Sequence, residues 1–494
     1  MTADLRGALL VAGTTSDAGK SVLTTGLCRW LARQGVNVAP FKAQNMSNNS
    51  MVTADGAEIG RAQWVQAIAA RAEPEAAMNP VLLKPGSDRR SHVVLMGRPW
   101  GDLDASSFAD ARSSLEQAAY AAFDDLASRY DVVVCEGAGS PTEINLREHD
   151  FVNMGLAQHA QLPVVVVGDI DRGGVFAAMY GTLKLMPEAD QRLLRAFVIN
   201  KFRGESSLLE PGLRMIEEAT ERPVLGVLPW LPDLWLDSED AIDLEGRRAL
   251  RDPGVPLQVA VVRFPRISNF TDVDALAVEP GVDVHFVDSP EGVKGADLVV
   301  LPGTRATLDD LAWLRQRGLE GPLVERHRGG EPILGICGGF QMLGQRVADP
   351  DGAESGTQAA STGLGLLPAR TTFRREKVLG RPRGHALGHE VDGYEIHHGE
   401  VTVRGGEPFL DGCREGATWG TLWHGAFEND GFRRAFLEQV ASDANRVDWK
   451  PGTDTVFADQ RERRIEALAD AVEEHLDTRA LLDMIASGGQ GSRT

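Results

Sequence analysis

Cysteine is scarce in this sequence. The 494 residues include only four cysteines, and none of them stands in a CxxC pair or at another metal-ligand spacing. So few scattered thiols do not make a disulfide framework. We therefore expect a protein of a reducing compartment, the cytoplasm.

Long apolar runs and an excess of positive charge are absent as well. No window approaches the roughly 18 uninterrupted apolar residues that a membrane span requires, and the apolar run at 8–13 is too short for a signal peptide. The net charge of −20 argues against a nucleic-acid-binding surface. We expect neither a membrane nor nucleic acid as a partner, and any anionic ligand needs a local cradle of cations or backbone amides.

Short runs rich in Val, Ile and Leu alternate with longer amphipathic segments along the chain. Continuous apolar runs are typical of parallel strands that are buried on both faces of a sheet. The runs that we predict as strands are 8–13, 37–41, 131–137, 163–169, 195–201 and 223–229, followed by 257–264, 282–288, 296–303 and 332–339.

This alternation predicts an α/β fold with two doubly wound domains of mainly parallel sheet. The first domain is expected to span 1–235 and the second 257–440. The polar, acidic stretch 236–256 has the composition of an exposed linker. Residues 441–494 are predicted to form a helical C-terminal tail.

A glycine-rich loop, "GTTSDAGKS", joins the first predicted strand to a helix. Backbone N–H groups of Gly13, Thr14 and Gly19 are expected to face phosphate oxygens of ATP. Lys20 is expected to reach the β- and γ-phosphates, and the Ser21 hydroxyl to bind Mg²⁺. The loop is one residue longer than the usual phosphate loop. A glycine turn that only caps a helix is the alternative, but Gly-Lys-Ser directly after a strand favours phosphate binding.

Further candidate ligands stand at the ends of other predicted strands. Glu136 ends one of them, where ligands of open α/β sheets bind, and its carboxylate suits Mg²⁺. Asp55, on a polar loop, is a second candidate metal ligand. Lys42 is placed to meet a phosphate or an acyl phosphate, and Asn200 to read an adenine base. For each of these residues the alternative is a solvated surface side chain.

The second predicted domain contains "GICGGFQMLG" over 335–344, with Cys337 between a strand and a helix. Two glycines after the cysteine allow a sharp turn, so we predict a nucleophile elbow with an accessible, reactive thiol. Backbone N–H groups at the elbow and in 301–306 are candidates to bind an oxyanion. Cys28 and Cys135 lie in a helix-like and a strand-like segment, and we expect them to be small buried hydrophobes.

A reactive thiol needs a base, and histidine is the usual one. His424, in "TLWHGAFEN", follows a short strand-like run and precedes a glycine. His397 and His398 are competitors. A histidine beside an apolar run is more often packed or exposed than catalytic, but the elbow favours a Cys337–His424 pair.

These motifs resemble known families. "GICGGFQMLG" with a downstream "TLWHG" is similar to class I glutamine amidotransferase domains. That resemblance implies that Cys337 attacks the carboxamide of glutamine and that His424 is the base. The family's third member is a glutamate two residues after the histidine, where this chain has Ala426, with Glu428 two residues further on. The departure indicates a branch that works with a Cys–His pair.

The first half resembles the dethiobiotin synthetase-like P-loop group, whose loop has the same extra residue. With "PFKAQNMSNNS", "CEGAGSPTEINL" and "GDIDRGGVFA", nearly the whole chain is similar to the cobyric acid synthase family of the cobalamin pathway. The resemblance implies ATP- and Mg²⁺-dependent amidation of the b, d, e and g carboxylates of a corrinoid, adenosylcobyrinic acid a,c-diamide. Each carboxylate would become an acyl phosphate, which ammonia from glutamine then displaces. A protected route for that ammonia is part of the hypothesis, and the resemblance leaves the oligomeric state open.

Other readings remain open at this point. The a,c-diamide synthase of the same pathway shares both activities, and a cell-wall amidotransferase is a more distant rival. Outside the enzymes, the first half is compatible with a partition-type ATPase switch that binds partners or DNA. The net charge and the attached cysteine elbow argue against that switch.

Overall fold

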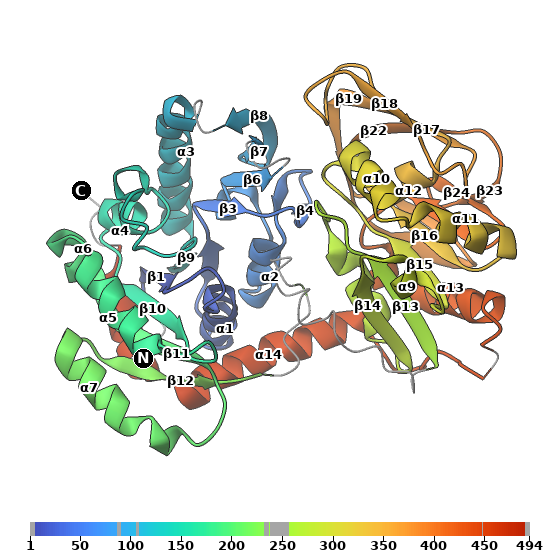
Figure 1. Cartoon of the computed structure of the whole chain (residues 1–494). Coiled ribbons are helices and arrows are strands. Elements are labelled where there is room, and N and C mark those ends of the chain that lie inside the picture. The colour runs from blue at the N-terminus through green and yellow to red at the C-terminus, as the bar shows by residue number, and fades with distance from the viewer. Residues whose placement is uncertain are drawn as a thin grey trace.

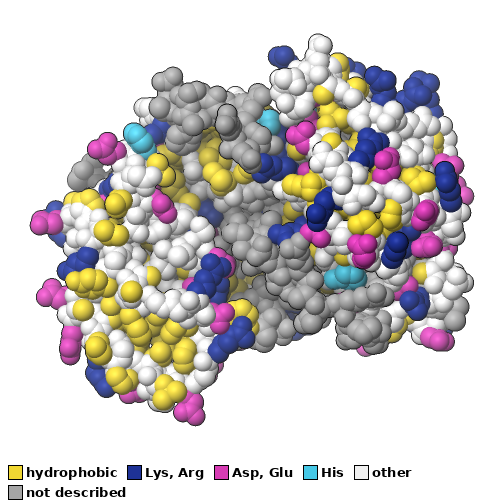
Figure 2. Space-filling model, in the orientation of Figure 1, with side chains coloured by type: hydrophobic (Ala, Val, Ile, Leu, Met, Phe, Trp, Pro, Cys, Tyr) yellow, Lys and Arg dark blue, Asp and Glu magenta, His cyan; other side chains and the backbone are white. Residues whose placement is uncertain are grey.

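The protein was analysed as a computed structural model, and the structure describes residues 5–85, 90–104, 108–231, 237, 256–446 and 448–489. Figure 1 shows two α/β lobes side by side, with α14 (Phe457–His475) crossing from the second lobe to the first along the lower side. Figure 2 shows Lys and Arg side chains between the two lobes on this face. Of the helices described, none has both the length and the apolar character needed to cross a bilayer.

The first lobe is built on a six-stranded parallel sheet of order β12-β11-β10-β1-β9-β2. Every strand predicted for this domain is present, because each apolar run is buried between helices on both faces. The strands are β1 (Gly7–Gly13), β2 (Val38–Phe41), β9 (Val132–Glu136), β10 (Val164–Asp169), β11 (Leu194–Phe202) and β12 (Val224–Pro229). The helices are α1 (Lys20–Arg33), α2 (Arg61–Ala69), α3 (Phe108–Arg129), α4 (Met154–Ala160), α5 (Val175–Leu185), α6 (Glu188–Leu193) and α7 (Glu210–Thr220).

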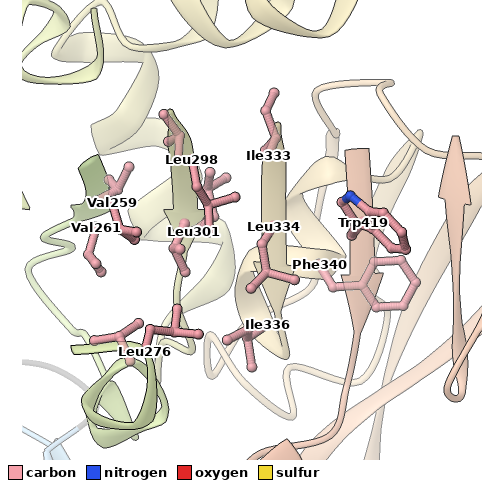
Figure 3. Packing of buried hydrophobic residues seen from close by; sticks show 14 of the residues in the cluster. Val259, Val261, Leu276, Leu298, Leu301, Ile333, Leu334, Ile336, Phe340 and Trp419 are labelled. Carbon is pink, nitrogen blue, oxygen red and sulfur yellow. The ribbon is translucent and has the colours of Figure 1, made fainter. Parts of the chain in front are cut away.

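The second lobe has a seven-stranded sheet of order β14-β13-β15-β16-β25-β24-β23, parallel over its first five strands. Its core includes Leu298, Leu334, Phe340 and Trp419, with Phe340 beside Trp419 (Figure 3). The strands are β13 (Leu257–Val262), β14 (Val282–Val287), β15 (Leu298–Leu301), β16 (Ile333–Ile336), β23 (Glu407–Phe409), β24 (Gly412–Glu415) and β25 (Thr418–Thr421). The main helices are α10 (Thr307–Gln316), α11 (Glu320–Gly329), α12 (Gly338–Leu343) and α13 (Asp430–Asp443).

Each lobe also carries smaller sheets that the apolar runs did not predict. The first has a four-stranded sheet of β3 (Gln44–Met46), β6 (Val81–Pro85), β7 (Arg90–Leu95) and β8 (Arg98–Asp104), and a hairpin of β4 (Ser50–Val52) and β5 (Glu58–Gly60). The second has a sheet of β17 (Arg346–Asp349), β18 (Ala359–Thr362), β19 (Ala369–Gly380) and β22 (Glu395–Val403), and a hairpin of β20 (Arg383–Ala386) and β21 (His389–Asp392). These additions meet at the junction of the lobes, where β4 packs against β22.

The C-terminal tail is helical, but it belongs to the first lobe. Helices α14 and α15 (Thr478–Ser487) pack in one apolar cluster with β1 and α1, to which they contribute Ile465, Ala469, Val472, Leu481 and Ile485. The fully buried Arg29 of α1 donates to the carboxylates of Glu462 and Glu466 on α14. The tail therefore completes the helical layer on one face of the first sheet.

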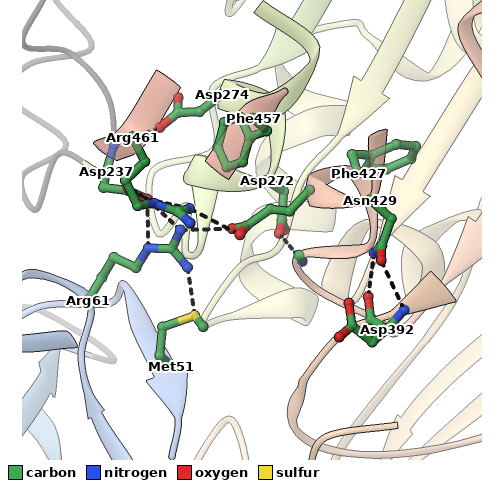
Figure 4. A network of polar contacts seen from close by, with 12 residues as sticks. Met51, Arg61, Asp237, Asp272, Asp274, Asp392, Phe427, Asn429, Phe457 and Arg461 are labelled. Atoms are coloured by element: carbon green, nitrogen blue, oxygen red, sulfur yellow. Dashed lines mark hydrogen bonds and ion pairs between the residues drawn. The ribbon is translucent and has the colours of Figure 1, made fainter. Parts of the chain in front are cut away.

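The predicted exposed linker contains a buried anchor. Of 236–256, the structure describes only Asp237 and Pro256. Asp237 is buried and accepts hydrogen bonds from Arg61 of α2 and Arg461 of α14 (Figure 4). The prediction of exposure is wrong at Asp237, because two arginines from distant elements need a carboxylate where they meet. The rest of the predicted linker lies outside the described residues.

Candidate functional site

The glycine-rich loop lies between the end of β1 and the start of α1. Gly19 has φ 102°, and a Cβ there would lie 1.9 Å from Nδ2 of Asn200, so only glycine fits. Lys20 Nζ donates to the backbone oxygens of Thr15 and Ser16 and to that of Gly139, at 3.0 Å each. The loop is thus wrapped around its own lysine at the C-terminal edge of the sheet, as the phosphate-cradle prediction requires.

Glu136, at the end of β9, gathers several of the predicted site residues. Its Oε1 accepts hydrogen bonds from Ser21 Oγ and Lys42 Nζ, both at 2.9 Å, and Gln66 donates to Oε2. Burial alone would raise the pKa of Glu136, but Lys42 and the Gln66 hydrogen bond hold it below its usual value. A buried, ionised carboxylate beside a serine hydroxyl fits Mg²⁺, which takes one or two carboxylates and completes its shell with phosphate and water oxygens.

Of the two other predicted site residues, Asp55 lies apart from the Glu136 cluster and Asn200 supports the phosphate loop. Asp55 is exposed in the turn between β4 and β5, where it accepts a hydrogen bond from Thr53, and no contact recorded for the described residues joins it to Glu136. Asn200 is buried and donates to the backbone oxygen of Ala18 at 3.0 Å. Asn200 therefore supports the phosphate loop, and its contact with adenine stays a prediction. In the described part of the chain, no group of three or more His, Cys, Asp or Glu residues forms a ready-made metal site.

Cys337 forms the predicted elbow between β16 and α12. Its backbone has φ 49° and ψ −109°, a conformation that side chains rarely adopt, and its N–H donates to the oxygen of Thr421 at 2.8 Å. A Cβ on Gly339 would lie 1.9 Å from the oxygen of Leu301, so the helix can turn back against β15 only with glycine here. The strained turn is therefore built into the packing of the sheet.

The thiol of Cys337 is not on the outer surface. The residue is only 6 % exposed, so the prediction of a thiol accessible on the surface of the protein is wrong. The thiol lines a partly open cavity whose lining residues come from both lobes. The second lobe contributes most of the lining, including Arg305, Gln341, His397 and Lys377, and the first lobe contributes Lys84.

His424 lies in the loop after β25 and is hydrogen-bonded to Cys337. Its Nδ1 lies 2.6 Å from Oδ2 of Asp272, whose other oxygen accepts the N–H of Gly425 at 2.8 Å. Burial would lower the pKa of His424, but Asp272 and Cys337 together raise it to about 10. His424 therefore contacts the Cys337 sulfur on one side and the Asp272 carboxylate on the other.

Asp272 answers the question that the sequence left open. Ala426, at the position of the missing glutamate, is fully buried in the core, and Glu428 pairs with Arg61 and Arg461 instead of His424. Asp272 comes from a short turn, Phe270–Val273, far upstream of the histidine. No spacing rule connects Asp272 with His424, so the sequence could not identify this carboxylate. Because Asp272 contacts His424, the expected Cys–His pair without a partner is wrong. The run "SNFTDVD" offered only a polar turn as a signal.

The two competing histidines also line the Cys337 cavity. His398 Nδ1 lies 3.2 Å from the oxygen of Arg374, and burial with nearby Arg305 and Lys377 lowers its pKa to about 3. Neither ring nitrogen of His397 has a hydrogen-bond partner among the described residues, although its Nε2 lies 3.9 Å from Oε1 of Glu395. Of the three histidines, His424 is the one in contact with both the thiol and a carboxylate, which supports its prediction as the base.

A phosphate loop and a Cys–His–Asp elbow in one chain define an enzyme class, the nucleotide-dependent glutamine amidotransferases. Residues 9–242 match the CobQ/CobB/MinD/ParA nucleotide binding domain, and residues 258–432 match the CobB/CobQ-like glutamine amidotransferase domain. The chain is 61 % identical to the cobyric acid synthase of Mycobacterium marinum over 485 residues, which is 97 % of each chain. It is 61 % identical to that of Mycolicibacterium vanbaalenii over 478 residues, 96 % of each. The chain belongs to the cobyric acid synthase family.

Proposed function

We propose that this enzyme amidates the b, d, e and g carboxylates of adenosylcobyrinic acid a,c-diamide, using ATP and glutamine, to give adenosylcobyric acid. The observation that carries the proposal is that one chain contains both sites, in two lobes that pack against each other. The Ser21–Glu136–Lys42 cluster suits activation of a carboxylate by ATP. The Cys337–His424 pair suits release of ammonia from glutamine. Relatives over nearly the full length carry the name of the corrinoid amidating enzyme.

In the glutaminase half, the Cys337 sulfur attacks the carboxamide carbon of glutamine. The oxygen that becomes negative is bound by backbone N–H groups of the elbow and of 303–304, whose backbone packs directly against Gly338. His424 gives its proton to the leaving nitrogen, so the C–N bond breaks and ammonia departs. Water, deprotonated by His424, then cleaves the thioester and releases glutamate.

In the synthetase half, the loop amides and Lys20 bind the phosphates of ATP. The substrate carboxylate attacks the γ-phosphorus, the bond to the β,γ-bridging oxygen breaks, and ADP leaves. Ser21 and Glu136 are the residues that would hold Mg²⁺, which supplies charge neutralisation at the phosphates when bound. Lys42, next to Glu136, is placed to stabilise the acyl phosphate. Ammonia then attacks the acyl carbon and phosphate leaves, which forms the amide.

Ammonia connects the two halves of the reaction. Most free ammonia is protonated at neutral pH, and ammonium has no lone pair with which to attack an acyl phosphate. A protected route from Cys337 to the phosphate loop would keep it reactive. The cavity that both lobes line at Cys337 supports such a route.

Mass spectrometry of the products tests the proposed function. With ATP, glutamine and adenosylcobyrinic acid a,c-diamide, we expect successive one-unit mass losses that end at four new amides. Cobyrinic acid without the a,c-amides is the control substrate, since the a,c-diamide synthase would prefer it. Amidation of that control alone would reject the assignment within the pathway, and no amidation of either corrinoid would reject it altogether.

A further inference from the structure

A buried ionic cluster joins the two lobes beside the Cys337 cavity. Glu58 of β5 accepts hydrogen bonds from Lys84 of β6, at 2.7 Å, and from Lys377 of β19 in the other lobe. Ser50 of β4 donates to Glu58 at 2.9 Å and accepts from Lys84 at 2.8 Å. Glu58 is fully buried and the two lysine side chains are at most 8 % exposed. Both lysines line the cavity that contains Cys337.

The charges of this cluster do not cancel. Two ammonium groups share one carboxylate, and Arg305 adds a third cation to the cavity lining. Glu354 is the only acidic residue among the described residues of that lining, and burial raises its pKa to about 7, which weakens its negative charge. Burial, Arg305 and Lys377 keep His398 neutral, as its low pKa shows. The same positive field disfavours an ammonium ion but not neutral ammonia.

Two buried glutamines of α2 connect β3 with the phosphate site. Gln63 and Gln66 lie one turn apart on the same face of α2 and are both fully buried. Gln63 accepts a hydrogen bond from Asn45 of β3, and Gln66 donates to Glu136. Within the described residues, Nε2 of Gln63 and Oε1 of Gln66 have no hydrogen-bond partner. Buried amide atoms without a partner are destabilising, so two on one face indicate a small polar guest.

The distance to be covered is short. Asn79 donates to the backbone oxygen of Lys42, whose side chain binds Glu136. Lys84 is five positions after Asn79, which in extended chain amounts to roughly 16 Å. Asn45, the partner of Gln63, stands opposite Leu82 in the middle of that span.

We propose that the Lys84–Glu58–Lys377 cluster is the gate through which ammonia from Cys337 enters the first lobe, and that Gln63 and Gln66 bind it on the way to the acyl phosphate. The cations repel ammonium. The unpaired Nε2 of Gln63 donates a hydrogen bond to ammonia, and the unpaired Oε1 of Gln66 accepts one from it. This inference rests on the proposed function and assigns its transfer step to named residues.

Isotope competition tests the gate. The enzyme is given glutamine labelled with ¹⁵N in its amide, together with unlabelled ammonium, and product amides are analysed by mass spectrometry while released glutamate is measured. The wild type should form one labelled amide for each glutamate. Lys377→Met and Gln63→Met should retain glutamate release and ammonium-supported amidation, but lose labelled product several-fold per glutamate. Lys377→Met should also admit more unlabelled ammonium.

Arg147→Met is the matched control, because it breaks the Arg147–Asp190 ion pair of the same lobe, away from α2 and β6. It should keep one labelled amide per glutamate. The proposal is overturned if Lys377→Met and Gln63→Met also keep that ratio while both half-reactions proceed. If Lys377→Met does not fold, the uncharged change Gln63→Met decides the question. A wild type that amidates with neither nitrogen source would instead overturn the proposed function, since ammonium-supported amidation does not need the gate.

Discussion

Asp272 sets the charge state of the glutaminase site. A carboxylate 2.6 Å from Nδ1 favours the imidazolium form of His424, whose other nitrogen faces the Cys337 sulfur. A protonated histidine beside a thiol favours the thiolate, which is the nucleophilic form. Asp272 touches neither glutamine nor the thiol, so it acts as a positioning residue. The turn that carries Asp272 is hydrogen-bonded to the first lobe: the Asn269 side chain accepts a hydrogen bond from the N–H of Ser50 at 2.9 Å.

We expect Asp272→Asn to lower glutamine hydrolysis by about 100-fold, the low end of what a positioned acid–base group contributes. Without the carboxylate, the pKa of His424 falls from about 10, so the alkaline limb of the pH–rate profile should move to lower pH. In the native protein this raised pKa stabilises the fold below the unfolded value near 6.5, and the stabilisation disappears as pH rises through about 10.

The control for that variant is Asp297→Asn, which removes another buried carboxylate of the same lobe. Asp297 binds the N–H of Gln258 and the side chain of Arg446 and has no recorded contact with His424. It should lower the melting temperature without moving the pH profile. An unshifted profile in Asp272→Asn, measured with folded protein, would remove Asp272 from the mechanism.

At the scale of elements, the main strands were predictable and the smaller sheets were not. Buried parallel strands are continuous apolar runs, so sequence alone places β1 or β13. The β4–β5 hairpin is polar because Ser50 and Glu58 face the junction of the lobes, and its pattern predicts only a loop. Cys337 and Lys20 were predictable because local glycine motifs surround them. Asp272 and Asp237 were not, since only tertiary packing brings them to their partners.

Helix α14 lies so close to α1 that a side chain at Gly26 has no room. A Cβ there would lie 2.8 Å from the oxygen of Leu468 and 2.9 Å from Cγ2 of Val472. We expect Gly26→Ala to destabilise the protein by about 1–3 kcal/mol, because the backbone of α14 must shift. Thermal unfolding measures this. Gly181→Ala in α5 is the matched control: nothing lies within 4 Å of its Cβ, so it should stabilise by about 0.5–1 kcal/mol. Equal effects of both changes would contradict the close packing.

At the scale of the molecule, two reaction sites lie in two lobes that share buried charges. Arg61 of the first lobe binds Glu428 of the second at 2.8 Å, and Arg461 of the tail binds Glu428 as well. Arg461 also binds Asp237 (Figure 4). Breaking a buried ion pair by removing one partner costs about 3–5 kcal/mol, so the lobes are held in one arrangement. The chemistry of each site nevertheless depends on its own residues.

We expect Lys20→Ala to abolish amidation with either nitrogen source while basal glutamine hydrolysis persists, because Lys20 donates hydrogen bonds to the phosphate loop and to Gly139 of the first lobe. The measurements are glutamate release and amide formation on the same folded protein. Loss of both activities would show that the phosphate loop also controls the thiol.

The complementary change is Cys337→Ser. It should eliminate glutamate release, since a serine hydroxyl is a far weaker nucleophile than a thiolate, yet leave amidation with added ammonium. Cys413→Ser, at another buried cysteine of the second lobe, should leave glutamate release in place. Persistent glutamine hydrolysis in Cys337→Ser would move the nucleophile elsewhere.

The return of α14 and α15 to the first sheet has a consequence for how the polypeptide is made. On the ribosome, the residues of β1 and α1 emerge before the second lobe, but the helices that cover them are translated after it. An apolar face of the nascent first lobe therefore stays uncovered until the entire amidotransferase lobe has been synthesised and α14 and α15 follow. A message or a protease that ends the chain early therefore leaves the ATP-binding half unfinished, even though every residue of its phosphate loop is present.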